Sequence, residues 1–412
     1  MKKPLFIAAL LASATTFAAA PANFIALSDT HFSHTTQSTD YGKDTGNLLW
    51  QHALTKIHQL RENHSLGSKS PKFMLLLGDL PAHHTSVEEH NTNSQTVLQD
   101  LRGAVDGLPV FYVPGNNDSL GGNYHSFTDA DGNTPFSLDS KQGWPALNAK
   151  ASCVDAAHEA CFYHSPYNLR YGNYAAYPMG TEAHLRLIAM NSVVFSNSGK
   201  HPYAADDGTE QAKAAQLTLD WLQNELRDAQ MKGDKVYLAM HVPPGEDAFS
   251  AGDMWKPLQY DNNHTDQQQF LDEIDAYKSI VAGVFFSHTH YDELRKLHSS
   301  HGDVSTVAFS VPGLTPQHYN NPAFKLFSFA PSTGELLDSV TMYTEPKKAD
   351  FGGDYYVFSA EYGCNASMVA CVLGLPQAKL NQVMNKDYLV RSNASDEKWD
   401  QVDETIDVQY KR

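Results

Sequence analysis

The sequence predicts an α/β fold of two packed β-sheets flanked by helices, with a small, mainly helical C-terminal part. Short apolar runs recur along the chain, and residues at helical spacing fill several of the intervals between them. After residue 300 such runs follow one another with only turns between them. Strands that alternate with helices are typical of parallel sheets, and strands joined by short turns are typical of antiparallel sheets.

Six of the apolar runs have the length and the lack of polar alternation that are typical of strands buried on both faces. Each run ends in polar side chains that can bind a metal. The runs and the residues that follow them are FIALS before Asp29-Thr30-His31, FMLLLG before Asp79, VFYVPG before Asn116-Asn117-Asp118, LRLIAM before Asn191, KVYLAM before His241, and GVFFS before His288-Thr289-His290. Because open sheets bind ligands at the carboxyl ends of their strands, we expect these side chains to lie at one edge.

Helices are predicted in two of the intervals. Residues 47–63 and 216–230 place apolar side chains at helical spacing, and Trp221, Leu222 and Leu226 mark one stripe of the second segment.

The chain after residue 300 has a different organisation. The runs VSTVAFSVP, FKLFSFAP and ELLDSVTMY are separated by turn residues, so we expect consecutive antiparallel strands that form a second sheet on the first. Residues 346–412 are richer in Asp, Lys and Asn, and we expect a helical subdomain there after a main domain over 23–345. The stretch 120–180 is expected to be a long excursion from the sheet.

The first 22 residues have the pattern of a secretory signal peptide. Lys2 and Lys3 precede a short apolar stretch, and small residues lead up to Ala22, where cleavage is expected. No later run reaches transmembrane length. We therefore expect an exported protein without a transmembrane anchor, either periplasmic or extracellular.

The four cysteines form two pairs that are close in the sequence. Three pairings are possible, and we expect the local ones, Cys153–Cys161 and Cys364–Cys371, because each closes a short loop. In an oxidising compartment each would stabilise the fold by roughly 2–3 kcal/mol. Their spacing does not match a structural zinc site.

The net charge argues against a nucleic acid duplex or an anionic membrane as partner. The chain of 412 residues has 30 Lys and Arg against 47 Asp and Glu, which gives −17. Such a charge repels phosphate backbones and anionic lipid.

The residues at the strand ends favour a centre for two metal ions. Seven oxygen and nitrogen donors follow five separate strands: Asp29, His31, Asp79, Asn116, His241, His288 and His290. Divalent cations bind this mixture of carboxylate, amide and imidazole. Seven donors exceed the needs of one tetrahedral ion, and they suit two ions that share a carboxylate, roughly 3.5–4 Å apart.

In their order and spacing these motifs resemble the calcineurin-like metallophosphoesterases, and in particular the acid sphingomyelinase-like phosphodiesterase branch. The resemblance extends from about residue 24 to 345. The stretches that resemble motifs of the branch are GDLPAHH (78–84), AMHVPPG (239–245), SHTHYDE (287–293) and VPGLTPQHYNNPAFKLF (311–327). The resemblance implies a two-sheet sandwich flanked by helices, the metallophosphoesterase fold.

The resemblance also implies how the metals would be divided. One ion would bind Asp29, His31 and His290, the other would bind Asn116, His241 and His288, and Asp79 would bridge them. Zinc is the metal that the resemblance implies, while manganese and iron fit the same ligands. Two cations lower the pKa of a bridging water toward about 7, so that hydroxide can attack phosphorus.

The chain departs from the family at the proton donor. The family has a histidine directly after the metal-binding asparagine, but this chain has Asn117, which is not an acid. His83, in the GDLPAHH stretch, is the best replacement, and His84, His125 and His318 are weaker candidates. Alternatively, good leaving groups need no acid, and Asn117 then hydrogen-bonds a phosphate oxygen.

Four further residues are candidates for supporting roles. We expect Asp118 to orient a neighbour of the metals and Asp292 to hydrogen-bond a ligand histidine. Asn191 is either a site residue or a turn residue, and His318 is a candidate for substrate contact. For the aromatic residues Tyr291 and Tyr319, ordinary packing is the better expectation.

The predicted function is hydrolysis of a soluble phosphodiester or phosphoanhydride, of nucleotide or phosphocholine type. Nothing in the chain matches the six-cysteine saposin module with which sphingomyelin-cleaving members lift lipid from membranes. Two alternatives remain: a broad phosphomonoesterase, and a metal- or phosphate-binding protein whose catalysis was impaired by Asn117. The sequence does not define an oligomeric state.

Overall fold

The computed structural model describes most of the chain. The described residues are 20–62, 70–119, 122–127, 146–163, 171–197, 209–247, 252–394 and 406–410. Most of the predicted signal peptide therefore lies outside the described residues. Within them, no helix is both long enough and apolar enough to cross a membrane.

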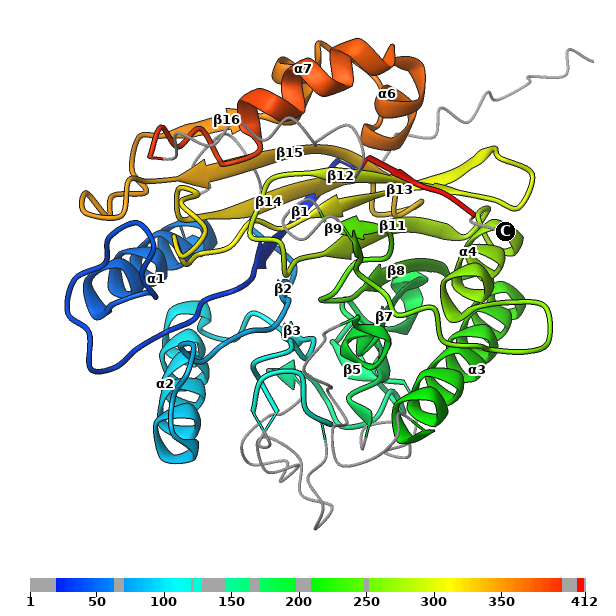
Figure 1. Ribbon diagram of the computed structural model, residues 1–412, viewed down its shortest axis with the longest axis horizontal. Coiled ribbons are helices and arrows are strands. Elements are labelled where there is room, and N and C mark those ends of the chain that lie inside the picture. Colours follow the sequence, from blue (N-terminus) through cyan, green and yellow to red (C-terminus); the bar gives the residue numbers. More distant parts are fainter. Residues whose placement is uncertain are drawn as a thin grey trace, which may run out of the picture.

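Two mixed sheets form the centre of the molecule (Figure 1). In the first sheet β1, β2 and β3 are parallel to one another and the other strands are antiparallel to their neighbours. Its strands, in spatial order, are β16 (Tyr355–Val357), β15 (Leu336–Tyr343), β14 (Ala323–Phe329), β1 (Ala22–Leu27), β2 (Met74–Leu76), β3 (Val110–Tyr112) and β4 (Ala146–Leu147).

In the second sheet β7, β8, β11 and β13 run parallel. Its strands, in spatial order, are β17 (Asp407–Val408), β12 (Leu294–His298), β13 (Val304–Ser310), β11 (Val281–Phe286), β8 (Lys235–Ala239), β7 (Leu185–Ala189), β6 (Tyr174–Tyr177) and β5 (Cys161–Phe162). A small separate hairpin consists of β9 (Glu246–Asp247) and β10 (Gly252–Asp253).

Helices cover the outer face of each sheet (Figure 1). The helices α1 (Asn47–Glu62) and α2 (Val87–Val105) share an apolar core with the first sheet, and α3 (Thr209–Lys232) and α4 (Asp266–Ala276) share one with the second. The predicted helices over 47–63 and 216–230 are thus found as α1 and within α3. Ser86 and Thr265 cap α2 and α4 with reciprocal side-chain hydrogen bonds, which fixes where these helices begin.

The inward faces of the two sheets form a third core between them. Phe24 of β1 stacks on Phe73 with ring centroids 4.8 Å apart, and its edge meets Phe285 of β11 at 5.4 Å. Neighbouring residues in the strands, such as Ile25 and Val284, point outward to the helices. Apolar side chains are therefore needed on both faces, which explains the continuous apolar runs in the sequence.

The predicted pairing of the strands after residue 300 is wrong in one respect. Residues 304–310 (β13) do not join the two strands that follow them; β13 lies beside β11 in the second sheet, whereas β14 and β15 extend the first. The turn residues between the runs are the same in both arrangements. In the observed arrangement the first sheet combines strands from both ends of the chain, β1 to β3 and β14 to β16.

The C-terminal part contains the expected helices α5 (Phe358–Tyr362), α6 (Met368–Gly374) and α7 (Gln377–Asp387). It is less separate than predicted, because β16 joins the first sheet and β17 joins the second. Both cysteine pairs are disulfides in the expected local pairing, Cys153–Cys161 and Cys364–Cys371.

Candidate metal centre

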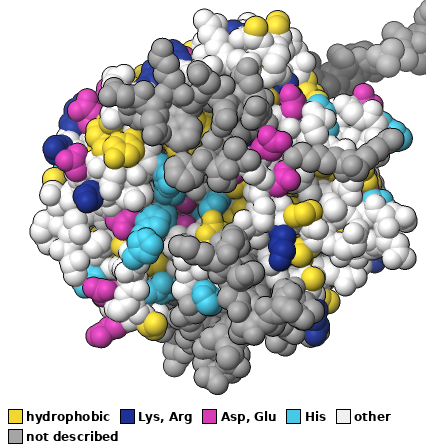
Figure 2. Space-filling view, in the orientation of Figure 1, with side chains coloured by type: hydrophobic (Ala, Val, Ile, Leu, Met, Phe, Trp, Pro, Cys, Tyr) yellow, Lys and Arg dark blue, Asp and Glu magenta, His cyan; other side chains and the backbone are white. Residues whose placement is uncertain are grey.

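The seven predicted ligands lie together where parallel strands of both sheets end. An isolated parallel β-bridge joins Ser28, directly after β1, to Gly313 at this edge. Each ligand follows the end of its strand by two to four residues. The strands and their ligands are β1 with Asp29 and His31, β2 with Asp79, β3 with Asn116, β8 with His241, and β11 with His288 and His290. In the space-filling view, histidine side chains gather around a hollow on this face (Figure 2).

Asp29, His31 and His290 form the first of two clusters. Oδ1 of Asp29 lies 3.4 Å from Nε2 of His290 and 4.0 Å from Nε2 of His31. One potential ligand atom from each of the three residues falls within 4.8 Å of the other two. One cation can therefore reach all three.

Asp79, His241 and His288 form the second cluster, and their ligand atoms also lie within 4.8 Å of one another. Oδ1 of Asn116 lies 3.0 Å from Nε2 of His241, so the amide belongs to the same group. Oδ2 of Asp79 is 3.5 Å from Nε2 of His241 and 3.4 Å from Nε2 of His31. A single carboxylate oxygen thus stands between the two clusters, as a bridging ligand requires.

The backbone at this edge adopts conformations that residues other than glycine rarely use. A positive φ at such a residue costs of order 1–3 kcal/mol and is typical of functional sites. The residues and their φ values are Asp29 (44°), His31 (37°), Asp79 (54°), His288 (74°) and His290 (66°). A Cβ atom on Gly115 would collide with the Asp79 carboxylate, which explains the glycine before Asn116.

Contacts at Nδ1 orient the imidazole rings of His241 and His31. Nδ1 of His241 lies 2.6 Å from the carbonyl oxygen of Leu77 and 2.8 Å from Oγ of Ser287. Nδ1 of His31 lies 3.1 Å from the carbonyl oxygen of Pro81. A proton on Nδ1 leaves the Nε2 lone pair for a cation, the arrangement found around metal-binding histidines.

Two polar atoms of the first cluster lack hydrogen-bond partners among the described residues. Oδ1 of Asp29 and Nε2 of His31 are buried and accept or donate no hydrogen bond within the part of the chain that the structure describes. Buried polar atoms without a partner are rare, since each costs free energy. A divalent cation would satisfy both atoms, so the residues fit the metals that the sequence predicts.

The charges of the cluster also suit cations. Burial lowers the pKa of His31 and of His288 to about 3, and it lowers the pKa of His290 well below the ordinary value. These imidazoles are therefore neutral, which is the form that binds metals. Burial alone would raise the pKa of Asp79, but the positive charge and hydrogen bond of His241 hold it well below the usual range, so the carboxylate is ionised. Burial would in turn lower the pKa of His241, but Asp79 raises it to about 9, and a cation at Nε2 of His241 would replace the proton there.

The two residues after Asn116 hold Asp79 in place. The backbone N–H of Asn117 donates to Oδ1 of Asp79 at 2.7 Å, and the Asn117 amide donates to Oδ2 at 2.8 Å. Asp118 accepts hydrogen bonds from the backbone N–H groups of Asp79, Leu80 and Gly115 at 2.7–2.8 Å. Both residues thus orient the carboxylate that stands between the clusters.

His83 lies beside the first cluster with a partner that the sequence did not indicate. Its ring stacks on that of His31, with centroids 3.8 Å apart. Asp44 accepts from the His83 backbone N–H at 2.9 Å through Oδ2, and its Oδ1 lies 2.7 Å from Nδ1 of the ring. Burial would lower the pKa of His83, but the hydrogen bond and charge of Asp44 raise it above the ordinary value.

A cavity of about 240 Å³ opens onto the two clusters. Asp44, Tyr124 and Asp247 were not predicted from the sequence, because none of them follows a buried apolar strand: Asp44 and Tyr124 lie in loops, and Asp247 lies in the short hairpin strand β9. For Asp44, the only sequence feature that could have indicated a role is its place in the polar loop before α1. The residues that line the cavity are Asp79, His83, Asn116, Asn117, Asn123, Tyr124, Asp247, Met254, His288, Thr289, His290, Tyr291, His318 and Tyr388.

Asp292 does not play the predicted part. Its carboxylate accepts hydrogen bonds from Lys325 at 2.6 Å, Thr341 at 2.8 Å and Tyr356 at 2.6 Å, and none from a ligand histidine. The carboxylate points to the first sheet because the buried ammonium group of Lys325 needs a counter-charge there. The expected hydrogen bond is therefore a wrong prediction.

Asn191 lies outside the cavity as a turn residue, whereas His318 lines the cavity. Asn191 caps a short 3₁₀ helix by accepting from the Val193 N–H at 3.1 Å, and its amide donates to the Tyr171 carbonyl, as a turn residue would. His318 lines the cavity, with its ring centroid 4.6 Å from that of His290. Among the aromatic candidates, Tyr291 stacks on Tyr388 at 4.4 Å, and Tyr319 is 48% exposed outside the cavity.

Comparison with known protein families identifies the family of the chain. The calcineurin-like phosphoesterase family matches residues 22–292, which is more than half of the chain. The chain belongs to this family. The matched region contains all seven predicted ligands together with Asp44 and His83.

Curated relatives are similar at low identity. The chain is 24% identical over 309 residues to sphingomyelinase phosphodiesterase D of Dictyostelium discoideum, covering 74% of this chain and 61% of that protein. It is 25% identical over 335 residues to the cyclic GMP-AMP phosphodiesterase SMPDL3A of Rattus norvegicus, covering 77% and 68%. The chain thus spans only part of the length of these relatives. A crystal structure of a dimetal phosphatase from Danio rerio matches with 13% identity and a TM-score of 0.46, covering 82% of this chain and 98% of the other.

Proposed function

We propose that this phosphoesterase hydrolyses soluble phosphodiesters or phosphoanhydrides with two divalent cations. The observation that carries the proposal is the Asp79 carboxylate, which stands within 3.5 Å of an imidazole of each cluster. The names of the relatives, a sphingomyelinase phosphodiesterase and a cyclic GMP-AMP phosphodiesterase, favour diesters over monoesters.

The chain's own residues would hold the cations as two groups. Asp29, His31 and His290 would bind one, and Asn116, His241 and His288 would bind the other, with Asp79 shared. Bound divalent cations, zinc being the first expectation, acidify water and neutralise charge on phosphoryl oxygens. Asn117 and Asp118 would keep Asp79 in position between them.

His83 would supply the proton that the leaving oxygen needs. Water provides the oxygen that bonds to phosphorus, and the bond from phosphorus to the leaving oxygen breaks with its electron pair on that oxygen. His83 donates its Nε2 proton there, and the proton that water loses restores the imidazolium. Asp44 holds Nδ1 and the backbone of His83, so the donor stays on the cavity wall without the histidine that the family places at position 117.

We also propose that the protein is exported. Two disulfides within the described residues support this, because such bonds persist in oxidising compartments. The charged and apolar pattern of residues 1–22 supports it independently.

Metal analysis and a paired assay test the proposal. The purified protein should bind about two zinc, manganese or iron ions per chain, and a chelator should abolish its activity. Turnover of bis-p-nitrophenyl phosphate should exceed that of p-nitrophenyl phosphate; the reverse ranking would favour a monoesterase. If the metal-loaded protein turns over neither and Asn117→His restores turnover, a binding function replaces the proposed catalytic one.

A further inference from the structure

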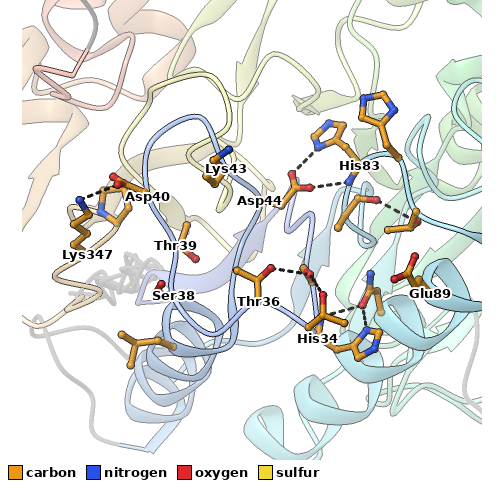
Figure 3. Close-up of a pocket in the computed structure, with 18 residues that line it drawn as sticks. His34, Thr36, Ser38, Thr39, Asp40, Lys43, Asp44, His83, Glu89 and Lys347 are labelled. Atoms are coloured by element: carbon orange, nitrogen blue, oxygen red, sulfur yellow. Dashed lines mark hydrogen bonds and ion pairs between the residues drawn. The ribbon is translucent and has the colours of Figure 1, made fainter.

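A second hollow lies against His83. It has a volume of about 680 Å³, within the range of small-molecule sites, and Figure 3 shows the side chains around it. None of the seven predicted metal ligands lines this hollow. Of the residues that the structure describes, only His83 lines both this hollow, hereafter the polar groove, and the cavity at the metal centre.

The position of His83 relates the groove to the reaction. A general acid gives its proton to the leaving oxygen, so the group attached to that oxygen must lie next to the acid. Asp44 occupies Nδ1 of His83 and lines the polar groove. Because His83 lines both hollows, a leaving group next to its ring can extend into the groove while the phosphoryl group stays at the metals.

Most residues that line the groove have polar or charged side chains, although much of the surface that they expose to the groove is carbon. Only Leu48, Ala82 and Pro346 are apolar. Hydroxyl groups, three imidazoles, two ammonium groups, three carboxylates and an amide make up the rest: Ser33, His34, Thr35, Thr36, Ser38, Thr39, Asp40, Lys43, Asp44, His83, His84, Thr85, Glu89, Asn93 and Lys347. Such a surface offers hydrogen bonds to the hydroxyl groups of a ligand and contact to its carbon atoms, whereas an acyl chain would leave the polar groups of the lining without partners.

Internal pairs fix part of this lining and leave part of it for a ligand. Asp40 and Lys347 form an ion pair at 2.8 Å, and Nδ1 of His34 lies 2.6 Å from Oδ1 of Asn93. The exposed side chains of Ser38 and Lys43, by contrast, have no hydrogen-bond partner among the described residues that the structure records. Both are labelled in Figure 3.

We propose that the polar groove binds the leaving group and selects a polyhydroxylated alcohol, such as a sugar or glycerol unit, over a hydrocarbon chain. The proposal rests on the proposed function and adds the class of alcohol that is released. Ser38 and Lys43 are the specificity-determining residues, because their free donors can bind the hydroxyl groups of the alcohol.

Two diesters that differ in the leaving group test the proposal. One is the methyl ester of glucose 6-phosphate, whose release of glucose or of methanol is read by product analysis. The other is ethyl p-nitrophenyl phosphate, whose leaving group does not need the donors of the groove. The proteins are the metal-loaded wild type, the double variant Ser38→Ala/Lys43→Ala, and Lys72→Ala, an exposed lysine that does not line the groove.

The wild type should release glucose rather than methanol. The double variant should raise KM for the glucose ester about tenfold and change kcat/KM for the nitrophenyl ester less than twofold, while Lys72→Ala should match the wild type on both. Equal losses on the two esters, no loss on either, or release of methanol would overturn the proposal. If the wild type turns over neither ester, the proposed function itself fails and this inference with it.

Discussion

Replacement of Asp44 by asparagine tests whether His83 is a held proton donor. In the structure Asp44 makes two hydrogen bonds with His83: Oδ1 lies 2.7 Å from Nδ1 of the ring, and Oδ2 accepts from the backbone N–H at 2.9 Å. An asparagine keeps the size of the side chain but loses its charge, and its single oxygen can accept only one of the two hydrogen bonds because the NH₂ group accepts none. The ring of His83 is then free to leave the orientation in which its Nε2 reaches the leaving oxygen.

The magnitude follows from the strength of such a contact. A hydrogen bond to a charged group contributes roughly 1.5–3 kcal/mol. The two side chains are 20% and 21% exposed, so solvent screens part of this, and about 1.5–2 kcal/mol is the better expectation. Loss of that energy in the transition state lowers kcat/KM roughly 10- to 30-fold.

The assay compares leaving groups of different basicity. An alkyl diester, whose leaving oxygen needs a proton, should show the full loss in Asp44→Asn, whereas a nitrophenyl diester should lose less than threefold. Asp261→Asn is the matched control, because Asp261 forms a similar pair with His264 at 3.0 Å away from the cavity. Equal losses on both esters would refute the role of Asp44 in proton donation and leave it a structural one.

Three further predictions concern the metals, the C-terminal strand and the core. Asp79→Asn should lower the metal content from about two ions per chain to less than one, measured by elemental analysis after gel filtration, because one carboxylate oxygen serves both clusters. The pKa of His298 is raised by its hydrogen bond to Asp407, so that its contribution is full below pH 6.5 and lost as the pH rises through the raised pKa. The pKa of Asp407 is lowered by the same bond, so that its contribution is full above pH 3.8 and lost at lower pH. The thermal midpoints of the wild type and His298→Asn should therefore differ most between pH 3.8 and pH 6.5. A difference that does not vary with pH would contradict the stabilising role of this pair. Phe24→Ala should reduce the free energy of unfolding in urea by about 3–5 kcal/mol, since Phe24 is fully buried between the sheets; a loss below about 1 kcal/mol would contradict the packing described.

The sequence by itself determined the parts of the site that follow strands. A run such as FMLLLG must be buried on both faces, and the chain has to turn where it ends, so Asp79 could be placed at a sheet edge without coordinates. The same reasoning holds for His241 and His288. The two cysteine pairs were predictable for a related reason, because each closes a loop too short to need knowledge of the rest of the fold.

The tertiary structure decided everything that depends on segments meeting across the chain. Whether β13 pairs with β11 or with β14 depends on how both sheets pack, since all three are predominantly apolar runs. Asp44 and Asp292 have the same chemistry in the sequence, yet one meets His83 and the other meets Lys325. Local sequence specifies burial and turns, whereas the partner of a loop carboxylate is set by the packing of distant elements, and here that packing selects the residue beside the proposed proton donor.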